Sequence, residues 1–151
     1  MIQGIVTKPL RVIPDDRGWL VELLRSDDEI FRGFGQVYLT TVYPGVIKAW
    51  HLHERQTDTI VCIRGNIRLG LYDPREGSPT HGQPGELILG DLNRVIVQVP
   101  PGIFHGFACL GDETAFVLNI PDRLYDYDKP DEIRRAFDDP EIPFSWETEN
   151  R

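Results

Sequence analysis

Two histidine-containing motifs, about fifty residues apart, constrain the fold of this chain more than any other feature of its sequence. The first spans 45–65 as Gly-x5-His-x-His-x4-Asp-x6-Gly and contains His51, His53 and Asp58, while the second, Pro-Pro-Gly-Ile-Phe-His, ends at His105. Because side chains alternate between the two faces of a strand, His51 and His53 are expected to point to the same face. Asp58 would follow on the next strand, and a Pro-Gly turn would deliver His105 from the other half of the sheet. Four groups able to bind a metal or move a proton are therefore predicted to meet in one cavity.

Short strand patterns dominate the whole chain. Gly, Pro, Asp and Asn separate them at intervals typical of an all-β sandwich or barrel. The clearest pattern places Ile67, Leu69 and Leu71 on one face of a strand and Arg68 and Tyr72 on the other. The predicted strands are 2–7, 19–24, 36–43, 46–51, 59–63, 67–72, 86–89, 95–99 and 114–120.

Helix and disorder are expected only in small parts of the chain. One or two short helices are predicted, at 26–31, capped by Ser26, and at 130–137, started by Pro130. Residues 147–151 show no periodicity and are expected to form a disordered tail. A chain of 151 residues can bury a single core but not two, so one domain over 1–151 is predicted.

Composition excludes several functions. A formal charge of −8 argues against broad nucleic-acid binding, which needs a basic face. The longest apolar runs are too short to cross a bilayer, and the first residues lack the charged and apolar segments of a signal peptide. Cys62 and Cys109 are expected to be free thiols. The sequence therefore predicts a cytoplasmic protein that binds neither nucleic acid nor a membrane.

The two histidine motifs resemble the signature of the cupin barrels, which implies a cupin double-stranded β-helix, a jelly-roll barrel closed around a cavity. Further landmarks resemble the dTDP-4-dehydrorhamnose 3,5-epimerase family, in order and approximate spacing, across nearly the whole chain. This resemblance implies a homodimer that needs no cofactor or metal and acts on a dTDP-linked 4-keto-6-deoxyhexose. The landmarks are 15–22, Gln36, 48–51, 64–65, 101–107, 138–140 and Trp146.

The resemblance also assigns roles to single residues. His51 stands at the family's general base, and His105 stands at its second active-site histidine. Lys48 stands where an arginine of the family meets the diphosphate. The residues that resemble the family's nucleotide-binding set are Arg17, Glu22 and Gln36, and the further residues expected at the substrate are Tyr38, His53, Arg68 and Tyr72.

The implied chemistry is proton transfer next to a ketone. A C4 ketone acidifies the protons on C3 and C5, so a neutral imidazole can remove one of them and leave an enolate. A positive or hydrogen-bonding group must then stabilise the enolate oxygen, and an acid must return a proton to the opposite face.

Several departures from the family pattern change this chemistry. The family's lysine, which aids the enolate, aligns with Asp58, and its tyrosine acid aligns with Leu118. An aspartate of the family aligns with Leu69, and the aspartate that orients the base aligns beyond residue 151. The family's usual His-x-Gln is replaced by a pattern that ends in His53.

Two repairs and three other functions stay open. Asp58 could hydrogen-bond His51 or His53 and orient it, and Tyr38 or Tyr72 could supply the acid. The chain could instead be a related 4-keto-sugar isomerase or a catalytically silent sugar-nucleotide binding protein. It could also be a metal-dependent cupin enzyme whose one divalent ion binds the three-histidine, one-carboxylate set His51, His53, Asp58 and His105.

Overall fold

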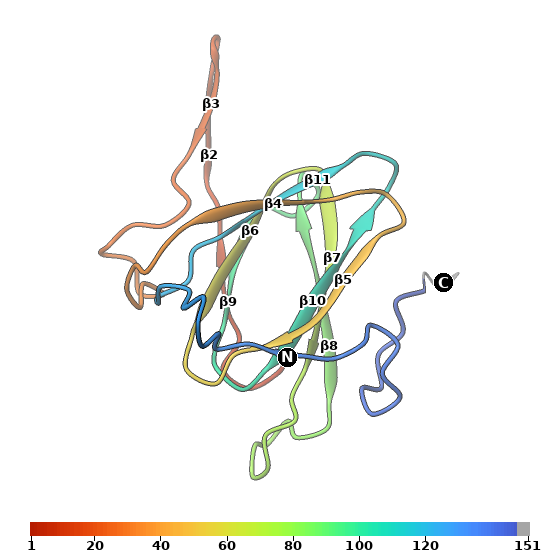
Figure 1. Ribbon diagram of the computed structural model, residues 1–151. Coiled ribbons are helices and arrows are strands. Elements are labelled where there is room, and N and C mark those ends of the chain that lie inside the picture. Colours follow the sequence, from red (N-terminus) through yellow and green to blue (C-terminus); the bar gives the residue numbers. More distant parts are fainter. Residues whose placement is uncertain (148–151) are drawn as a thin grey trace.

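The fold was obtained as a computed structural model, which describes residues 1–147. Within these residues the secondary structure consists of short strands, and Figure 1 shows them wound into a barrel. The strands are β1 (Val6–Pro9), β2 (Val12–Asp15), β3 (Gly18–Val21), β4 (Tyr38–Val42), β5 (Ile47–Leu52), β6 (Asp58–Arg64), β7 (Asn66–Tyr72), β8 (Pro84–Gly90), β9 (Val95–Val99), β10 (Phe104–Leu110), β11 (Ala115–Asn119) and β12 (Ile133–Arg134).

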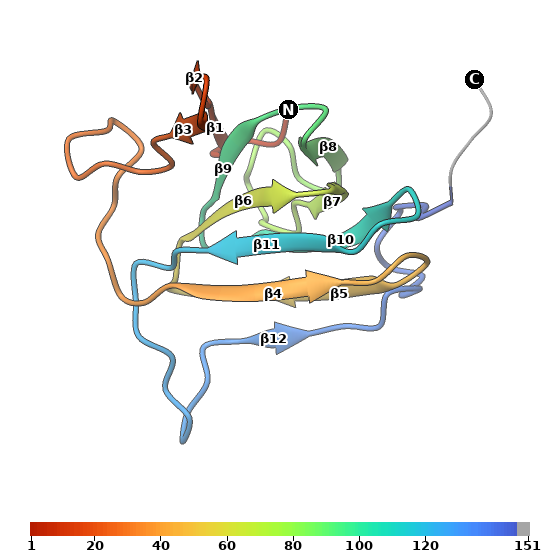
Figure 2. The ribbon, with the colours of Figure 1, turned by 90° about the horizontal axis from the view of Figure 1, so that it is seen from above.

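Two antiparallel sheets form the barrel. Their strand orders are β1-β9-β6-β11-β4 and β12-β5-β10-β7-β8, and β2 and β3 form a separate hairpin that projects from the barrel. Seen from above in Figure 2, β4 and β5 overlap, with β11 and β10 on one side of them and β12 on the other. The predicted all-β jelly roll is confirmed. Each predicted strand overlaps an observed one, whereas β2, β10 and β12 have no counterpart among the predicted strands.

The central strands are buried on both faces, which explains their nearly continuous apolar sequence. In β6, Ile60 packs in the cluster between the sheets, while its neighbour Val61 packs outward against Ile30 of the N-terminal segment. In β5, Trp50 packs outward against Ile142 of the C-terminal segment. Coil from both ends of the chain therefore covers the outer faces of the sheets.

A register shift between β5 and β10 shapes the interior. His105 pairs with His51, but Phe107 pairs with Lys48, so β5 holds one extra residue, as in a β-bulge. Lys48 and His51 consequently both line the interior despite their odd spacing. Gly106 lies at this shift, where an added Cβ would be 2.3 Å from a side-chain carbon of β5. The close approach of the two strands therefore requires a glycine directly after the second motif.

The helix predicted at 130–137 is wrong, because the structure has no helix within residues 1–147. This segment instead forms β12 at the edge of β5. Arg135 donates its backbone N–H to the carbonyl of Trp50 at 3.1 Å and accepts the N–H of Trp50 at 3.0 Å. These backbone groups are used between strands, so they are not available within a helical turn.

The helix predicted at 26–31 is wrong for a related reason. The carboxylate of Asp28 accepts hydrogen bonds from the backbone N–H of Arg25 and from the ammonium of Lys8. The carbonyl of Ile30 accepts a hydrogen bond from the buried side chain of Gln98. Contacts with β1 and β9 therefore fix this segment as turns.

Two other expectations concern the C-terminal tail and membrane-spanning helices. Most of the tail predicted at 147–151 lies outside the described residues, which end at Glu147. Within residues 1–147 no helix is long and apolar enough to cross a membrane.

Candidate active site

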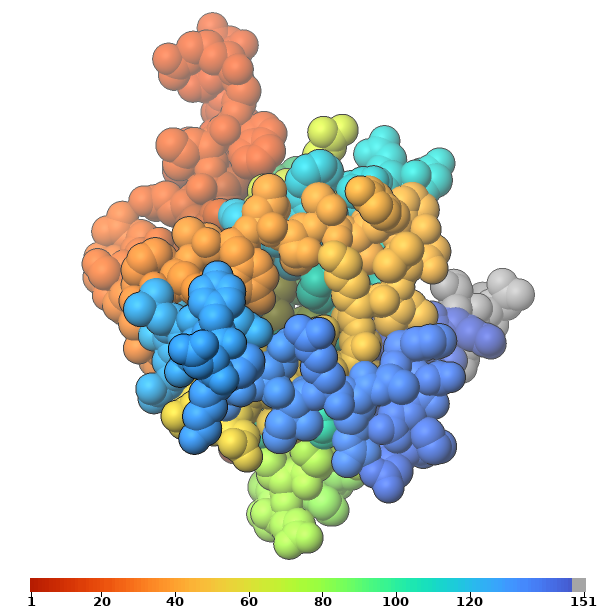
Figure 3. Space-filling model, viewed as in Figure 1, coloured from red at the N-terminus to blue at the C-terminus, as the bar shows by residue number. Residues whose placement is uncertain are grey.

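A cavity of about 620 Å³ opens at one end of the barrel. Figure 3 shows its mouth as a hollow between the orange surface of β4 and β5 and the blue surface of the segment after β11. Strands of both sheets line it, together with the coil before and after them. The lining side chains with polar groups are Gln36, Tyr38, Thr40, Lys48, His51, His53, Gln56, Asp58, His105, Asn119, Tyr125, Tyr127, Glu132 and Arg134.

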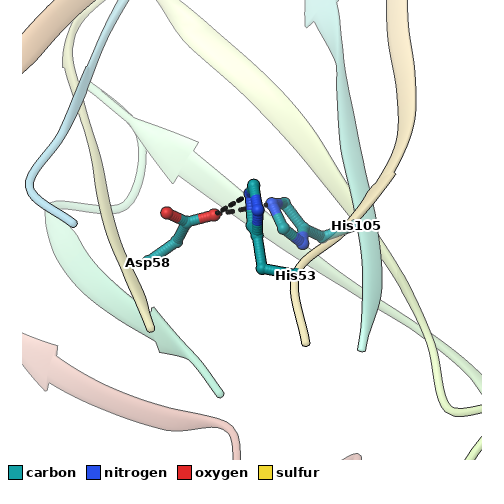
Figure 4. A group of neighbouring side chains, drawn as sticks. All are labelled: His53, Asp58 and His105. Atoms are coloured by element: carbon teal, nitrogen blue, oxygen red, sulfur yellow. Dashed lines mark ion pairs between the residues drawn. The ribbon is translucent and has the colours of Figure 1, made fainter. Parts of the chain in front are cut away.

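Asp58 is the centre of a hydrogen-bonded cluster in this cavity, although it is only 1% exposed. Its Oδ2 lies 3.2 Å from Nε2 of His53 and 3.0 Å from Nε2 of His105. Dashed lines mark these two contacts in Figure 4. Its Oδ1 accepts hydrogen bonds from the side-chain amides of Gln56 and Asn119, each at 2.8 Å. Four donors therefore surround one buried carboxylate, which satisfies both of its oxygens.

The hydrogen bonds of this cluster keep Asp58 ionised and His53 protonated. Burial alone would raise the pKa of Asp58, but the hydrogen bonds from His105 and His53 outweigh it and hold that pKa well below its ordinary range. Burial would lower the pKa of His53, but Asp58 raises it to about 9. The other ring nitrogen of His53 faces the carbonyl of Asp131. Because both nitrogens face oxygen acceptors, only the imidazolium form satisfies this site, and His53 is a cation at neutral pH.

His51 belongs to a second arrangement. Its Nδ1 lies 2.7 Å from Oε1 of Glu132, and Oε2 of Glu132 accepts hydrogen bonds from Arg134, 2.9 Å from Nε and 2.7 Å from Nη2. Because Nδ1 donates to the carboxylate, Nε2 is the nitrogen that keeps a lone pair. Arg134 and Glu132 thus fix both the orientation and the tautomer of a histidine in the cavity wall.

Burial keeps His51 neutral. It lowers the pKa of the imidazole, and the hydrogen bond to Glu132 opposes this effect only in part. Burial would raise the pKa of Glu132, but Arg134 and His51 outweigh it and lower that pKa. At neutral pH the pair is therefore a neutral imidazole beside a carboxylate, the form in which a histidine can accept a proton.

A sequence model of the family described as dTDP-4-dehydrorhamnose 3,5-epimerase matches residues 1–151. This chain belongs to that family. It is 43% identical to the "Probable low-salt glycan biosynthesis epimerase Agl13" of Haloferax volcanii, over 98% of this chain and 96% of that protein. It is 39% identical to the "Spore coat polysaccharide biosynthesis protein SpsL" of Bacillus subtilis, over the full length of both. The crystal structure of a dTDP sugar isomerase from Desulfovibrio desulfuricans superposes with a TM-score of 0.91 at 36% identity, covering 96% of this chain and 92% of that one.

Most of the site residues predicted from the sequence lie together in the cavity. His51, His53, Asp58 and His105 all line it, as the motif spacing predicts. The prediction that Asp58 bonds His51 or His53 holds for His53 alone. The other assigned residues in the cavity are Gln36, Tyr38 and Lys48, and the ammonium of Lys48 donates to Oγ1 of Thr40 at 3.0 Å.

Arg17 and Glu22 do not line this cavity. Arg17 lies in the turn of the β2–β3 hairpin, its side chain is 85% exposed, and it pairs with Asp15 at 2.6 Å. Glu22 follows the hairpin and pairs with Arg25 at 2.9 Å. Within one copy of the chain, these two residues are therefore separated from the other predicted site residues.

Arg68 and Tyr72 also lie outside the cavity. The predicted alternation of β7 is confirmed, but its inward face is the apolar one, and both residues point outward. The guanidinium of Arg68 lies over the ring of Phe144, 4.9 Å from its centroid, and Tyr72 stacks near Phe104. The outer face of this sheet is covered by the C-terminal segment, so these residues help to attach that segment to the barrel.

Leu118, the residue expected at the position of the family's tyrosine, does not line the cavity. Leu118 packs outward against the cluster that contains Val61 and Ile96. The residues of β11 that line the cavity are its neighbours, Val117 and Asn119. Strand parity therefore makes Asn119 the polar side chain that β11 presents to the site.

Sequence reasoning missed Glu132, Arg134, Gln56 and Asn119. Glu132 is 81 residues from His51 in the chain. The sequence predicts a helix around Glu132, so the pairing of β12 with β5 is not expected from it. The one available signal was an acidic residue two positions before an arginine, a pattern too common on protein surfaces to single out a site.

Three side chains of the cavity, His53, Asp58 and His105, also have the chemistry of metal ligands. One ligand atom from each of His53, Asp58 and His105 lies within 4.8 Å of the others. His51 is not part of this set, because Glu132 holds its ring. The expected four-ligand site is therefore reduced to three groups, and hydrogen bonds already engage both oxygens of Asp58.

Proposed function

We propose that this protein is an epimerase of a dTDP-linked 4-keto-6-deoxyhexose, and that it inverts C3, C5 or both by proton transfer next to the ketone. One observation carries the proposal most directly: a neutral imidazole, His51, is held by Glu132 in the wall of a cavity that also contains the imidazolium of His53. Membership of the epimerase family and the similarity to a dTDP sugar isomerase give the substrate class.

In the proposed reaction, Nε2 of His51 accepts the proton from the carbon next to the ketone. The ketone oxygen then carries the negative charge of the enolate. The resemblance places the family's lysine at Asp58, and a cation is still present beside that position because Asp58 keeps the neighbouring His53 protonated. A fixed cation in a partly closed cavity stabilises developing charge more strongly than water does.

The experiment that tests this function is isotope exchange. Purified protein is incubated with dTDP-4-keto-6-deoxyglucose in D2O, and deuterium at C3 and C5 is followed by NMR and mass spectrometry. Uptake at either carbon is expected, because the abstracted proton exchanges with solvent. Binding of dTDP without uptake at either carbon, over several 4-keto sugars, would instead support a silent binding protein.

Replacing Glu132 is expected to weaken the base without removing it. In Glu132→Gln the rate of exchange should fall by about 10- to 100-fold, the usual effect of losing a partner that orients a functional histidine. The pKa of His51 should also fall, because a carboxylate that favours the imidazolium is gone. The acidic limb of the kcat/KM profile should therefore move to lower pH. Glu141→Gln, at a surface carboxylate that pairs with Arg135, is the matched control and should change neither.

The prediction about metal is that the purified protein contains no stoichiometric ion. We propose that the cluster functions without metal because four donors already satisfy Asp58. Elemental analysis after expression in medium supplemented with Zn, Fe, Mn and Ni checks this. About one ion per chain that is lost in His53→Ala would favour a metal-dependent cupin enzyme, since His53 belongs to the possible ligand set.

We also propose that the protein is a homodimer in which the hairpin of one copy completes the nucleotide site of the other. Arg17 and Glu22, which resemble nucleotide-binding residues, lie on or beside a hairpin that extends away from their own barrel. The same hairpin exposes large apolar side chains that a second copy would cover, namely Ile13, Trp19 and Leu20.

Mixing two variants, each damaged in a different part of the site, tests this arrangement. Arg17→Ala should bind dTDP at least about tenfold more weakly, because a guanidinium pairs with a diphosphate through two hydrogen bonds. Mixed in equal amounts with His51→Asn, it should regain about a quarter of the wild-type sites, since half of the dimers then hold one intact site. A mixture no more active than its two components, or a monomer in sedimentation, would contradict the proposal.

A further inference from the structure

The acid that completes the proposed epimerisation is the missing part of this site. On β11 the two side chains that reach the cavity are Val117 and Asn119, and neither an alkyl group nor an amide can give a proton to carbon at neutral pH. A phenol is present on the neighbouring strand. Tyr38 of β4 is the direct cross-strand partner of Asn119, so both side chains lie on the same face of the sheet.

The hydroxyl of Tyr38 is held in place. The side-chain amide of Asn119 donates a hydrogen bond to the phenolic oxygen at 2.9 Å. Since the oxygen accepts this bond, its own hydrogen remains available for donation. Asn119 is itself fixed, because the same amide group donates to Asp58 at 2.8 Å. Burial raises the pKa of Tyr38, which keeps the phenol protonated.

Two other tyrosines line the cavity but lack this support. Tyr125 and Tyr127 lie in the coil after β11, with their rings 5.0 Å apart in a T-shaped contact. Tyr127 is 88% exposed. Tyr72, the other tyrosine considered from the sequence, points out of the barrel toward Phe104. Tyr38 is therefore the cavity tyrosine whose hydroxyl the strands themselves position.

Tyr38 and His51 also lie on different walls. Tyr38 belongs to the sheet that contains β4, and His51 belongs to the sheet that contains β5, so the cavity lies between them. Inversion at carbon requires that the proton leaves from one face of the sugar ring and returns to the other. An acid and a base on facing walls provide this geometry without movement of the ring.

We propose that Tyr38 is the catalytic acid that returns the proton to the sugar, and that Asn119 is its positioning residue. This inference rests on the proposed function. His51 Nε2 takes the proton from one face, and the carbon–hydrogen electrons form the enolate. The enolate carbon then takes the proton of the Tyr38 hydroxyl on the opposite face, which leaves a phenolate and an imidazolium. Solvent at the mouth of the cavity returns a proton to the phenolate and accepts one from His51.

Tyr38→Phe separates this step from proton abstraction. The variant should keep deuterium exchange within about threefold, because His51 can return a deuteron to the face from which it took the proton. Net inversion should fall by at least about 100-fold, the usual contribution of an acid catalyst. Asn119→Ala should show the same split at about tenfold, which a merely structural loss would not produce. Tyr43→Phe, at an exposed tyrosine outside the cavity, is the control and should change neither rate.

The outcomes separate the two hypotheses. If the wild type exchanges and inverts and Tyr38→Phe inverts at a similar rate, this inference fails while the proposed function stands. Loss of inversion in Tyr125→Phe, with Tyr38→Phe active, would overturn it in the same way. If the wild type does not exchange at all, the proposed function fails, and the assignment of Tyr38 fails with it.

Discussion

Replacing His51 with asparagine is expected to stop deuterium exchange at the sugar, with a loss of at least about 1,000-fold. The expected loss lies within the range measured for general bases, which contribute up to about 10,000-fold. It should be near the upper part of that range because Glu132, Arg134 and burial all act to present one neutral ring nitrogen. Asparagine is similar in size and can still donate a side-chain N–H to the carboxylate of Glu132, so the affinity for dTDP should change by less than about threefold.

The measurement compares exchange by NMR with dTDP binding by calorimetry in the same preparation. His81→Asn is the matched control, because His81 is an exposed histidine of the loop between β7 and β8 and does not line the cavity. Exchange in His51→Asn within tenfold of the wild type would show that another group removes the proton. Loss of dTDP binding in the same variant would place His51 at the nucleotide rather than at the sugar.

The barrel and the motif residues of its cavity could be predicted from local patterns. Alternation along the strands is a local property, and it places His51 and His53 in one cavity and Ile67, Leu69 and Leu71 in the core. Strands without alternation are harder to predict. β10 was not predicted as a strand although it contains His105, because its residues are apolar on both faces and show no alternation.

The rest of the site depends on contacts between segments far apart in the sequence. Glu132 reaches His51 because β12 pairs with the edge of β5, and no local pattern predicts that pairing. The same pairing replaces a helix that Pro130 and its neighbours favour locally, so tertiary contacts override propensity here. Asn119, rather than Leu118, faces the cavity because parity along β11 is set by its ladders to β4 and β6.

Replacing Asp58 with asparagine is expected to cause the largest loss of stability. The carboxylate is 1% exposed and accepts hydrogen bonds from His53, His105, Gln56 and Asn119. An asparagine amide would direct hydrogen atoms at some of these donors and would leave the charge of His53 without a partner. Removing one member of a buried ion pair typically costs about 3–5 kcal/mol. The raised pKa of His53 gives a similar figure, since a rise from 6.5 to about 9 corresponds to about 3 kcal/mol.

The loss should depend on pH with a defined sign. The folded pKa of His53 is raised, so its contribution is complete below pH 6.5 and disappears as the pH rises through about 9. The folded pKa of Asp58 is lowered, so its contribution is present above the ordinary value of 3.8 and disappears as the pH falls below it. The difference in the free energy of unfolding between wild type and Asp58→Asn should therefore be largest between about pH 4 and 6.5 and should shrink toward pH 9.5.

Urea unfolding of both proteins at pH 5.5, 7.5 and 9.5 measures this difference, and Asp73→Asn is the control that identifies its cause. Asp73 is also buried, but it pairs with Arg75 at 2.8 Å, and a guanidinium does not lose its proton in this range. The loss caused by Asp73→Asn should therefore stay constant from pH 5.5 to 9.5. A constant loss for Asp58→Asn as well would mean that His53 is not the protonated partner of Asp58. The cation that the proposed mechanism needs at the enolate would then have to come from Lys48 or Arg134, the other cationic side chains that line the cavity.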